Sequence, residues 1–206
     1  MIEVNLFSVP ASDVSAKFGS CVARARVDLE AIGSNAYEFT KGFIRDNLDN
    51  LEGSIGNSDL TQLINSNESL TTVDFATLKY VLKKIGYLVT IWNVAEDEEN
   101  SQGVGEGTIE YNIVNHNFLQ SDFPTATKLI PEEGKDIADI LSEIVEQSGV
   151  FDPSKFAGVK NPFTGLLNGL AQEKENTGNI NATIATQIYN ILDQLGFEIF
   201  CATAEI

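Results

Sequence analysis

Residues Thr72 to Val94 read TVDFATLKYVLKKIGYLVTIWNV, and this stretch decides the fold class. Gly86 divides it into two parts of different periodicity. Before the glycine, apolar residues recur every three or four positions, which predicts an amphipathic helix over 73–85, capped by Thr72. After the glycine, aromatic and β-branched residues predict a strand over 87–94, because such side chains suit a pleated sheet. A helix that leads directly into a strand indicates an α+β protein.

The same order of elements is predicted near the end of the sequence. A helix begins at Asn181 or Ala182 and ends at Leu195, where the apolar stripe stops. Gly196 follows, and alternating apolar residues then predict a strand over 197–203.

This repetition has two interpretations. When Gly196 is placed on Gly86, the apolar positions of the two stretches coincide. A duplication would divide the chain into two related lobes, 1–94 and 95–206. The alternative is a single domain over 1–206, because any amphipathic helix with a glycine stop before a strand has this pattern.

Weaker signals predict the remaining elements. We expect a small antiparallel sheet packed on several amphipathic helices, with Phe39 and Phe43 facing the core. The expected elements are strands over 2–6 and 108–115, and helices over 35–51, from Ser58 or Asp59 to 64, from Pro131 to 145, and over 162–171, with a surface loop over 173–178.

The segment over 12–32 fits two structures. From Ala23 to Ala31 apolar and polar residues alternate strictly, which predicts a strand. Apolar residues also fall on a helical stripe, and Ser12-Asp13 offers a cap. Because alanine and charged residues favour helices, the helix is the preferred prediction.

Composition excludes several functional classes. The chain has 206 residues and a net charge of −17, with 8 bases and 11 acids over 1–94 but 5 bases and 19 acids over 95–206. Such a charge repels nucleic-acid phosphate and anionic lipid. No apolar run reaches the roughly 18 residues of a membrane span, and Met1 to Leu6 lacks a secretory pattern. We therefore expect synthesis in the cytoplasm, no membrane partner and no direct sequence-specific contact with nucleic acid.

Catalytic and metal-binding groups are scarce in the sequence. His116 is the sole histidine, and no Cys or second His lies beside it at ligand spacing. Cys21 and Cys201 predict two free, partly buried thiols, because two cysteines do not make a disulfide framework. The glycine-rich run over 103–107 precedes a strand, whereas phosphate-binding glycines lead into a helix. We expect no enzyme activity, no cofactor and no bound metal.

Two kinds of segment are candidates for interaction. The acidic run over 95–107 cannot enter a core, which predicts a solvated tip, a charged docking loop or a loose cation site. Phenylalanines in polar segments are either contacts with other proteins or satellite core beneath long loops. The candidate interaction residues are Glu96, Asp97, Glu98, Glu99, Phe118, Phe123, Phe151 and Phe163.

The stretch from Asp59 to Tyr87 resembles the second half of helix-turn-helix regulators of the xenobiotic-response-element type. Those proteins often end in a helix, a Leu-Gly-aromatic turn and a strand, to which Ile85-Gly86-Tyr87 is similar. The resemblance implies salt-dependent DNA binding through Lys79, Lys83 and Lys84. The segment over 65–71 departs from that pattern, because it has no Arg or Lys to contact bases.

The whole chain resembles, in composition, the small acidic virion proteins of tailed bacteriophages that build neck, connector and tail rings. The shared traits are an Asn-rich, His-poor and Cys-poor composition, short α and β segments between long polar loops, and apolar termini. The resemblance implies a structural subunit of the virion, in a ring at the head-to-tail junction or tail. Its partners would be copies of itself and neighbouring virion proteins.

An acidic inhibitor or immunity-type protein is the alternative from another class. It would use the strongly negative second half of the chain to occupy a basic cleft of a nucleic-acid-binding protein. Such an inhibitor would be a compact monomer, whereas a ring subunit would form a discrete oligomer.

Overall fold

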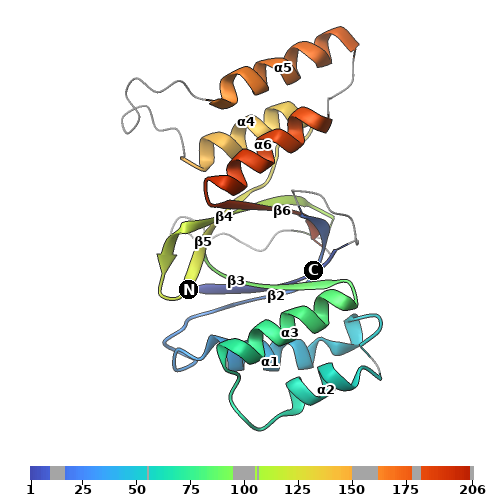
Figure 1. Cartoon of the computed structure of the whole chain (residues 1–206), viewed down its shortest axis with the longest axis vertical. Coiled ribbons are helices and arrows are strands. Elements are labelled where there is room, and N and C mark those ends of the chain that lie inside the picture. Colours follow the sequence, from blue (N-terminus) through green and yellow to red (C-terminus); the bar gives the residue numbers. More distant parts are fainter. Residues whose placement is uncertain are drawn as a thin grey trace. The chain divides into compact units, whose positions relative to one another are not determined.

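The computed structural model describes residues 1–9, 17–54, 56–94, 105, 107–149, 162–177 and 182–204 (Figure 1). These residues form strands and helices in comparable amounts, which confirms the predicted α+β class. In chain order the elements are β1 (Ile2–Ser8), β2 (Lys17–Val27), α1 (Ala36–Asp46), the 3-10 helix η1 (Leu48–Asn50), α2 (Ser58–Asn65), α3 (Thr72–Lys84), β3 (Tyr87–Val94), β4 (Ile109–Gln120), β5 (Phe123–Leu129), α4 (Ile137–Gln147), α5 (Pro162–Thr177), α6 (Ala182–Gln194) and β6 (Phe197–Ala204).

The chain divides into two compact units. Unit 1 comprises Met1–Ser12, Phe18–Thr108 and Ala202–Ile206, and unit 2 comprises Asp13–Lys17 and Ile109–Cys201. The first half of the element order is strand, strand, three α-helices, strand, and the second half has the same order.

In unit 1, β1 lies between β2 and β3 and pairs antiparallel with both. Successive side chains of a strand point to opposite faces of its sheet. Ile2, Val4 and Leu6 therefore share one face, and Glu3 and Asn5 lie on the other. All five side chains are buried, so the sheet of unit 1 has one apolar and one polar buried face.

Strand β2 shows that the preferred prediction of a helix over 12–32 is wrong. Over 17–27 the chain is a strand, and residues 10–16 lie outside the described part. The helix propensity of alanine and arginine is a weak preference, which tertiary pairing overrides. Arg26 lies opposite Glu3 and Arg24 lies opposite Asn5, so the polar residues of β2 match the polar face of β1.

The helices of unit 1 begin at well-formed caps. The Asn35 side chain accepts a hydrogen bond from the Glu38 amide and so caps α1. Thr71, rather than the predicted Thr72, caps α3 and forms a reciprocal capping box with Asp74. The helix predicted over 35–51 is divided, since α1 ends at Asp46 and the short η1 follows.

Helix α1 differs from its prediction in the face that it buries. Phe39 and Phe43 are only partly buried, whereas Thr40, Lys41 and Ile44 are buried. The prediction that Phe39 and Phe43 face the core is therefore wrong, and the buried face of α1 carries Ala36, Thr40, Lys41 and Ile44 instead.

In unit 2, β4 lies between β5 and β6. The core of this unit is formed by apolar side chains of all three strands and of α4, α5 and α6. Phe163 of α5, predicted to lie at an interface, is fully buried in this core, which corrects that prediction. Its apolar neighbours include Leu141, Ile144, Ile188 and Leu192.

Three elements of unit 2 differ from prediction at identifiable residues. Strand β5 is absent from the prediction, because Pro124 interrupts its alternating pattern. Helix α4 begins after Asp136, whose side chain accepts from two backbone amides, and Pro131 lies ahead of it. Helix α5 continues to Thr177 through the predicted surface loop.

Candidate functional site

The described residues contain neither of two common kinds of functional element. Within the described ranges, no three or more His, Cys, Asp or Glu are grouped so that they could hold a metal ion. Likewise, none of the described helices is both long and apolar enough to cross a bilayer. The chemically distinctive groups are polar side chains buried on the sheets and apolar side chains exposed on β4.

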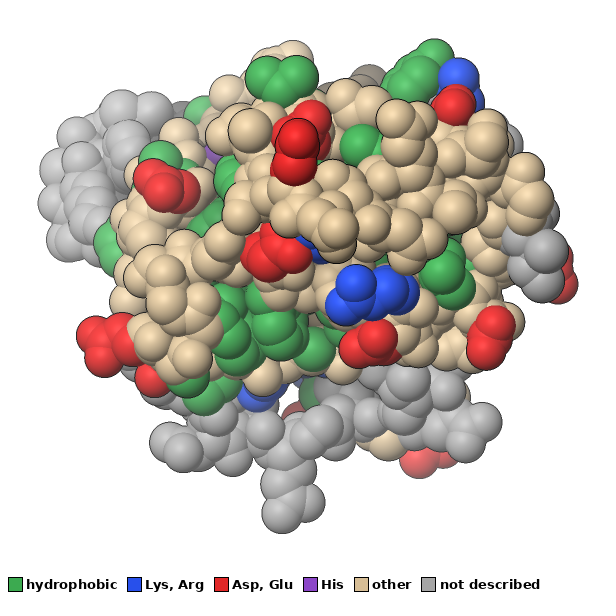
Figure 2. All heavy atoms as spheres, turned by 90° about the horizontal axis from the view of Figure 1, so that it is seen from below, with side chains coloured by type: hydrophobic (Ala, Val, Ile, Leu, Met, Phe, Trp, Pro, Cys, Tyr) green, Lys and Arg blue, Asp and Glu red, His purple; other side chains and the backbone are tan. Residues whose placement is uncertain are grey.

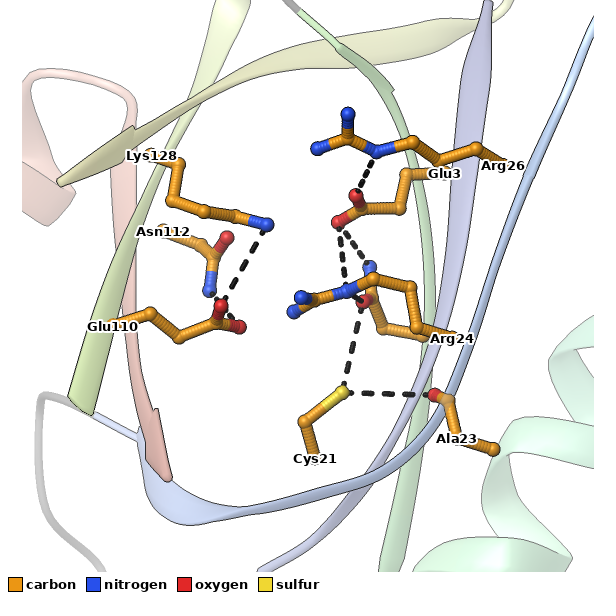
Figure 3. Close-up of polar contacts among 9 residues, drawn as sticks. Glu3, Cys21, Ala23, Arg24, Arg26, Glu110, Asn112 and Lys128 are labelled. Atoms are coloured by element: carbon orange, nitrogen blue, oxygen red, sulfur yellow. Dashed lines mark hydrogen bonds and ion pairs between the residues drawn. The ribbon is translucent and has the colours of Figure 1, made fainter. Parts of the chain in front are cut away.

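A buried polar cluster lies on β1 and β2 in unit 1 (Figure 3). Glu3 is 1% exposed, and its carboxylate oxygens lie 3.3 Å from Arg24 Nε and 2.7 Å from Arg26 Nε. Asn5 donates from Nδ2 to Glu3 Oε1 at 3.0 Å and accepts at Oδ1 from Arg24 Nε at 2.6 Å. The Cys21 thiol also donates to Asn5 Oδ1, at 3.8 Å. Two guanidinium groups thus share one carboxylate, which compensates for its removal from water.

A second polar cluster lies on β4 and β5 in unit 2 (Figure 3). Glu110 is fully buried, and its Oε2 lies 3.6 Å from Lys128 Nζ. Asn112, also buried, donates from Nδ2 to Glu110 Oε1 at 3.1 Å. The carboxylate–amide hydrogen bond of unit 1 therefore recurs in unit 2, with lysine in place of arginine as the cation.

The sequence and the strand register around these clusters also correspond. Strand β1 begins with Ile2-Glu3-Val4-Asn5 and β4 with Ile109-Glu110-Tyr111-Asn112. Arg24 lies opposite Asn5 on the neighbouring strand, and Lys128 lies opposite Asn112. The same two polar residues, with a cation at the same register position, therefore occur in both units.

The junction between the last helix and the last strand of each half corresponds as well. Gly86 and Gly196 both have a φ of +91°, a conformation that favours glycine. The Val9 amide donates to the Gly86 carbonyl at 2.9 Å, and the His116 amide donates to the Gly196 carbonyl at 2.8 Å. Val9 follows Glu3 by as many residues as His116 follows Glu110. An internal duplication predicts all of these correspondences, whereas a chance helix-glycine-strand pattern predicts only the glycines.

The two polar clusters have the chemistry of structural ion pairs. Each joins neighbouring strands at a fixed register, and the Cys21 thiol in the first lies beside an amide rather than beside a base. The sequence does not predict either cluster, because alternation shows which residues share a face of a strand but not whether the polar face is buried. The recurrence of Ile-Glu-x-Asn at the start of two strands is the signal that could have revealed them.

Both cysteines are free thiols, as predicted, but Cys21 is fully buried and only Cys201 is partly buried. Their surroundings make both thiols poor nucleophiles. Burial raises the pKa of Cys201, a hydrogen bond with Tyr111 lowers it, and the Glu110 charge raises it. Burial also raises the pKa of the neighbouring Tyr111 and of Tyr189. Because the thiolate is the reactive form of a cysteine, a raised pKa makes Cys201 less reactive.

We therefore expect Ellman's reagent at pH 8 to modify Cys21 and Cys201 slowly in the folded protein and rapidly in 6 M guanidinium chloride. Cys21 is fully buried, and the raised pKa of Cys201 keeps its thiol protonated at this pH. Absorbance at 412 nm follows the reaction. One equivalent of fast-reacting thiol in the folded protein would contradict this assignment.

A β-bulge interrupts the pairing of β4 in unit 2. Asn115 lies opposite Thr125 and Leu119 lies opposite Pro124, so residues 116–118 are extra residues of β4. Bulges of this kind redirect side chains and are common beside functional sites.

Polar contacts hold this bulge in place. The His116 amide donates to the Gly196 carbonyl, and its ring Nε2 lies 3.0 Å from Glu198 Oε2. Asn117 donates from Nδ2 to the Leu195 carbonyl at 2.6 Å. The bulge is thus fixed to the turn between α6 and β6 by both backbone and side chains.

The bulge presents large apolar side chains to solvent. Phe118 and Leu119 are each 59% exposed, and Leu195, whose carbonyl accepts from Asn117, is 38% exposed. We call these three residues the β4 bulge surface. Large apolar side chains exposed on a soluble protein are candidates for contact with another molecule.

The predicted interaction residues have different places in the structure. Phe118 lies on the β4 bulge surface, whereas Phe123 is partly buried and pairs with Gln120 across the hairpin turn. Phe163 is a core residue. Glu96, Asp97, Glu98, Glu99 and Phe151 lie outside the described residues.

The lysines implicated by the helix-turn-helix resemblance lie on α3. Lys79 Nζ is 5.3 Å from the centre of the Phe75 ring, and Lys84 Nζ is 4.5 Å from that of Tyr80. Both ammonium groups therefore contact aromatic rings of their own helix.

Comparison of this chain with protein-family models, with curated proteins and with solved structures finds no match.

Proposed function

We propose that this protein is a structural subunit that acts by protein–protein assembly through the β4 bulge surface. The observation that supports the proposal is the exposure of Phe118 and Leu119 on a bulge held by several hydrogen bonds. Burying one such side chain contributes about 1.5 to 3 kcal/mol, so both together can supply the apolar centre of an interface.

The rigidity of the bulge supports a binding role for its apolar residues. A segment whose backbone is already held in place loses less conformational freedom on association, and this preserves binding free energy. The polar groups of His116 and Asn117 bind residues of unit 2, whereas the Phe118 side chain is exposed. This division of roles is typical of a contact site rather than of a reactive one.

The specific assembly that we propose is a ring at the head-to-tail junction or tail of a tailed bacteriophage. The partners are copies of this chain and neighbouring virion proteins. A ring forms when the β4 bulge surface of one copy contacts a different surface of the next copy, because such head-to-tail contacts close by rotation. The composition of the chain is the reason to place this ring in a virion.

Replacing Phe118 and Leu119 together by serine is expected to weaken self-association at least tenfold. The change removes apolar area from the proposed interface and leaves the polar contacts of the bulge intact. Sedimentation velocity over a concentration series measures the association constant.

Val73→Ser is the matched control, because Val73 is 74% exposed on α3 in unit 1 and is not part of the β4 bulge surface. It is expected to associate as the unmodified protein does. Equal association of the double variant and the unmodified protein would exclude the β4 bulge surface as the interface.

A further inference from the structure

The helical layer of unit 1 contains two hollows that adjoin at a buried lysine. One, of about 280 Å³, lies along α1, and the other, of about 360 Å³, is lined by α2, the segment over 66–70 and α3. Lys41 Nζ pairs with Glu38 at the first hollow, at 2.6 Å. It also donates to the Ser66 and Glu68 carbonyls at the second, at 3.1 and 3.0 Å. We call the two hollows together the helical groove.

Lys41 joins α1 to the segment that follows α2, and α1 gives the groove an aromatic wall. Its ammonium group binds carbonyls that follow the end of α2, where the helix dipole favours a cation. Phe39 and Phe43 lie on the partly buried side of α1 and line the first hollow. Leu63 and Leu70 give the second hollow an apolar part as well.

Gly42 keeps the first hollow open. A Cβ atom at this position would meet only the end of the Arg45 side chain, 3.7 Å away. Glycine is unfavourable within a helix by about 1 kcal/mol relative to alanine, so its presence in α1 lowers stability. An open hollow beside two phenylalanines accounts for a glycine at this position.

Carboxylates outnumber cations around the helical groove. Five acids line its two hollows, whereas Lys41 is buried and Arg45 is the exposed cation of α1. Hydrogen bonds from Thr71 lower the pKa of Asp74, so this acid is charged at neutral pH. On this side of the molecule, hydrophobic side chains reach the surface among acidic and basic ones (Figure 2). The five acids are Glu38, Asp46, Asp59, Glu68 and Asp74.

We infer that the helical groove binds a basic, amphipathic segment of another protein. Apolar side chains of that segment contact Phe39 and Phe43, and its Lys or Arg side chains pair with the carboxylates. Charge complementarity decides the class of partner, because the groove is acidic and the chain carries a net charge of −17. This surface lies in unit 1 and is independent of the β4 bulge surface.

A fluorescein-labelled peptide of sequence KLLKLLKKLLKLLK is the probe, and fluorescence anisotropy measures its affinity at about 50 mM salt. Gly42→Leu is expected to weaken binding at least tenfold, because leucine fills the first hollow without any change in charge. Gly165→Leu is the matched control, since Gly165 is an exposed helical glycine in α5 with open space around it. Both substitutions favour helix formation, so neither is expected to impair folding.

Charge is tested separately from shape. Asp59→Asn at the second hollow is expected to weaken binding about threefold, whereas Asp193→Asn in α6 is expected to leave it unchanged. A peptide with glutamate in place of every lysine is expected not to bind.

The inference is overturned if Gly42→Leu and Gly165→Leu bind the probe equally, if the glutamate peptide binds as well, or if the basic peptide does not bind. Since these measurements leave the β4 bulge unmodified, their failure would not affect the proposed assembly.

Discussion

Replacing Glu3 by glutamine is expected to lower the free energy of unfolding by about 3 to 5 kcal/mol. The substitution preserves the size of the side chain and removes its charge. Arg24 and Arg26 then lose the carboxylate that both Nε atoms contact, while their own charges stay partly buried. Removing one member of a buried ion pair is costly because the remaining charge lacks compensation.

Urea denaturation followed by circular dichroism measures this effect. Glu132→Gln is the control, because Glu132 is 83% exposed and its ion pair with Lys135 is long, at 3.7 Å. Exposed pairs contribute little, so the control is expected to unfold at nearly the same urea concentration as the unmodified protein. If the two variants had equal stability, the cluster on β1 and β2 would not contribute to the fold as described.

Replacing Gly19 by alanine is expected to destabilise the protein by about 3 kcal/mol. A Cβ atom at Gly19 in β2 would lie 2.1 Å from the carbonyl oxygen of Ser8 in β1. That neighbour is backbone in a paired strand, so it cannot move away without loss of strand pairing. The close approach of the two strands therefore requires glycine at this position.

The same substitution at Gly165 should have the opposite sign. An added Cβ atom meets nothing within 4 Å there, and alanine favours a helix over glycine by up to about 1 kcal/mol. Thermal unfolding of the two variants is expected to shift their midpoints in opposite directions. Equal shifts would show that β1 and β2 do not approach each other so closely at Gly19.

The elements with the strongest local signals could be predicted from the sequence. The stretch over 72–94 combines helical spacing, a left-handed glycine and a β-branched run, and the structure has α3 and β3 there. The matching stretch near the end of the chain forms α6 and β6. In both, local preference and tertiary packing favour the same structure.

Elements that depend on a distant partner could not be predicted. Strand β2 has the composition of a helix, and its polar residues are explained only by Glu3 and Asn5 on β1. The buried face of α1 includes Lys41, whose carbonyl partners at residues 66 and 68 are not revealed by the spacing of Phe39 and Phe43. In each case a buried polar group overrides the apolar pattern.

Only part of the β4 bulge surface could be predicted from the sequence. Phe118 was a predicted interaction residue, but Leu119 and Leu195 were not, because their exposure depends on the bulge in β4. Phe163 has a similar polar neighbourhood in sequence, yet α5 places it in the core. Phe118 is exposed and Phe163 is buried, a difference that their sequence neighbours do not reveal.

The most direct test of assembly is the mass of the unmodified protein in solution. Multi-angle light scattering over a concentration series, at low and high salt, measures it. The proposed ring predicts a discrete oligomer whose mass is a whole multiple of 22.4 kDa and persists at high salt, because apolar contacts hold it. A mass of one chain at every concentration and both salts would contradict self-assembly through the β4 bulge surface.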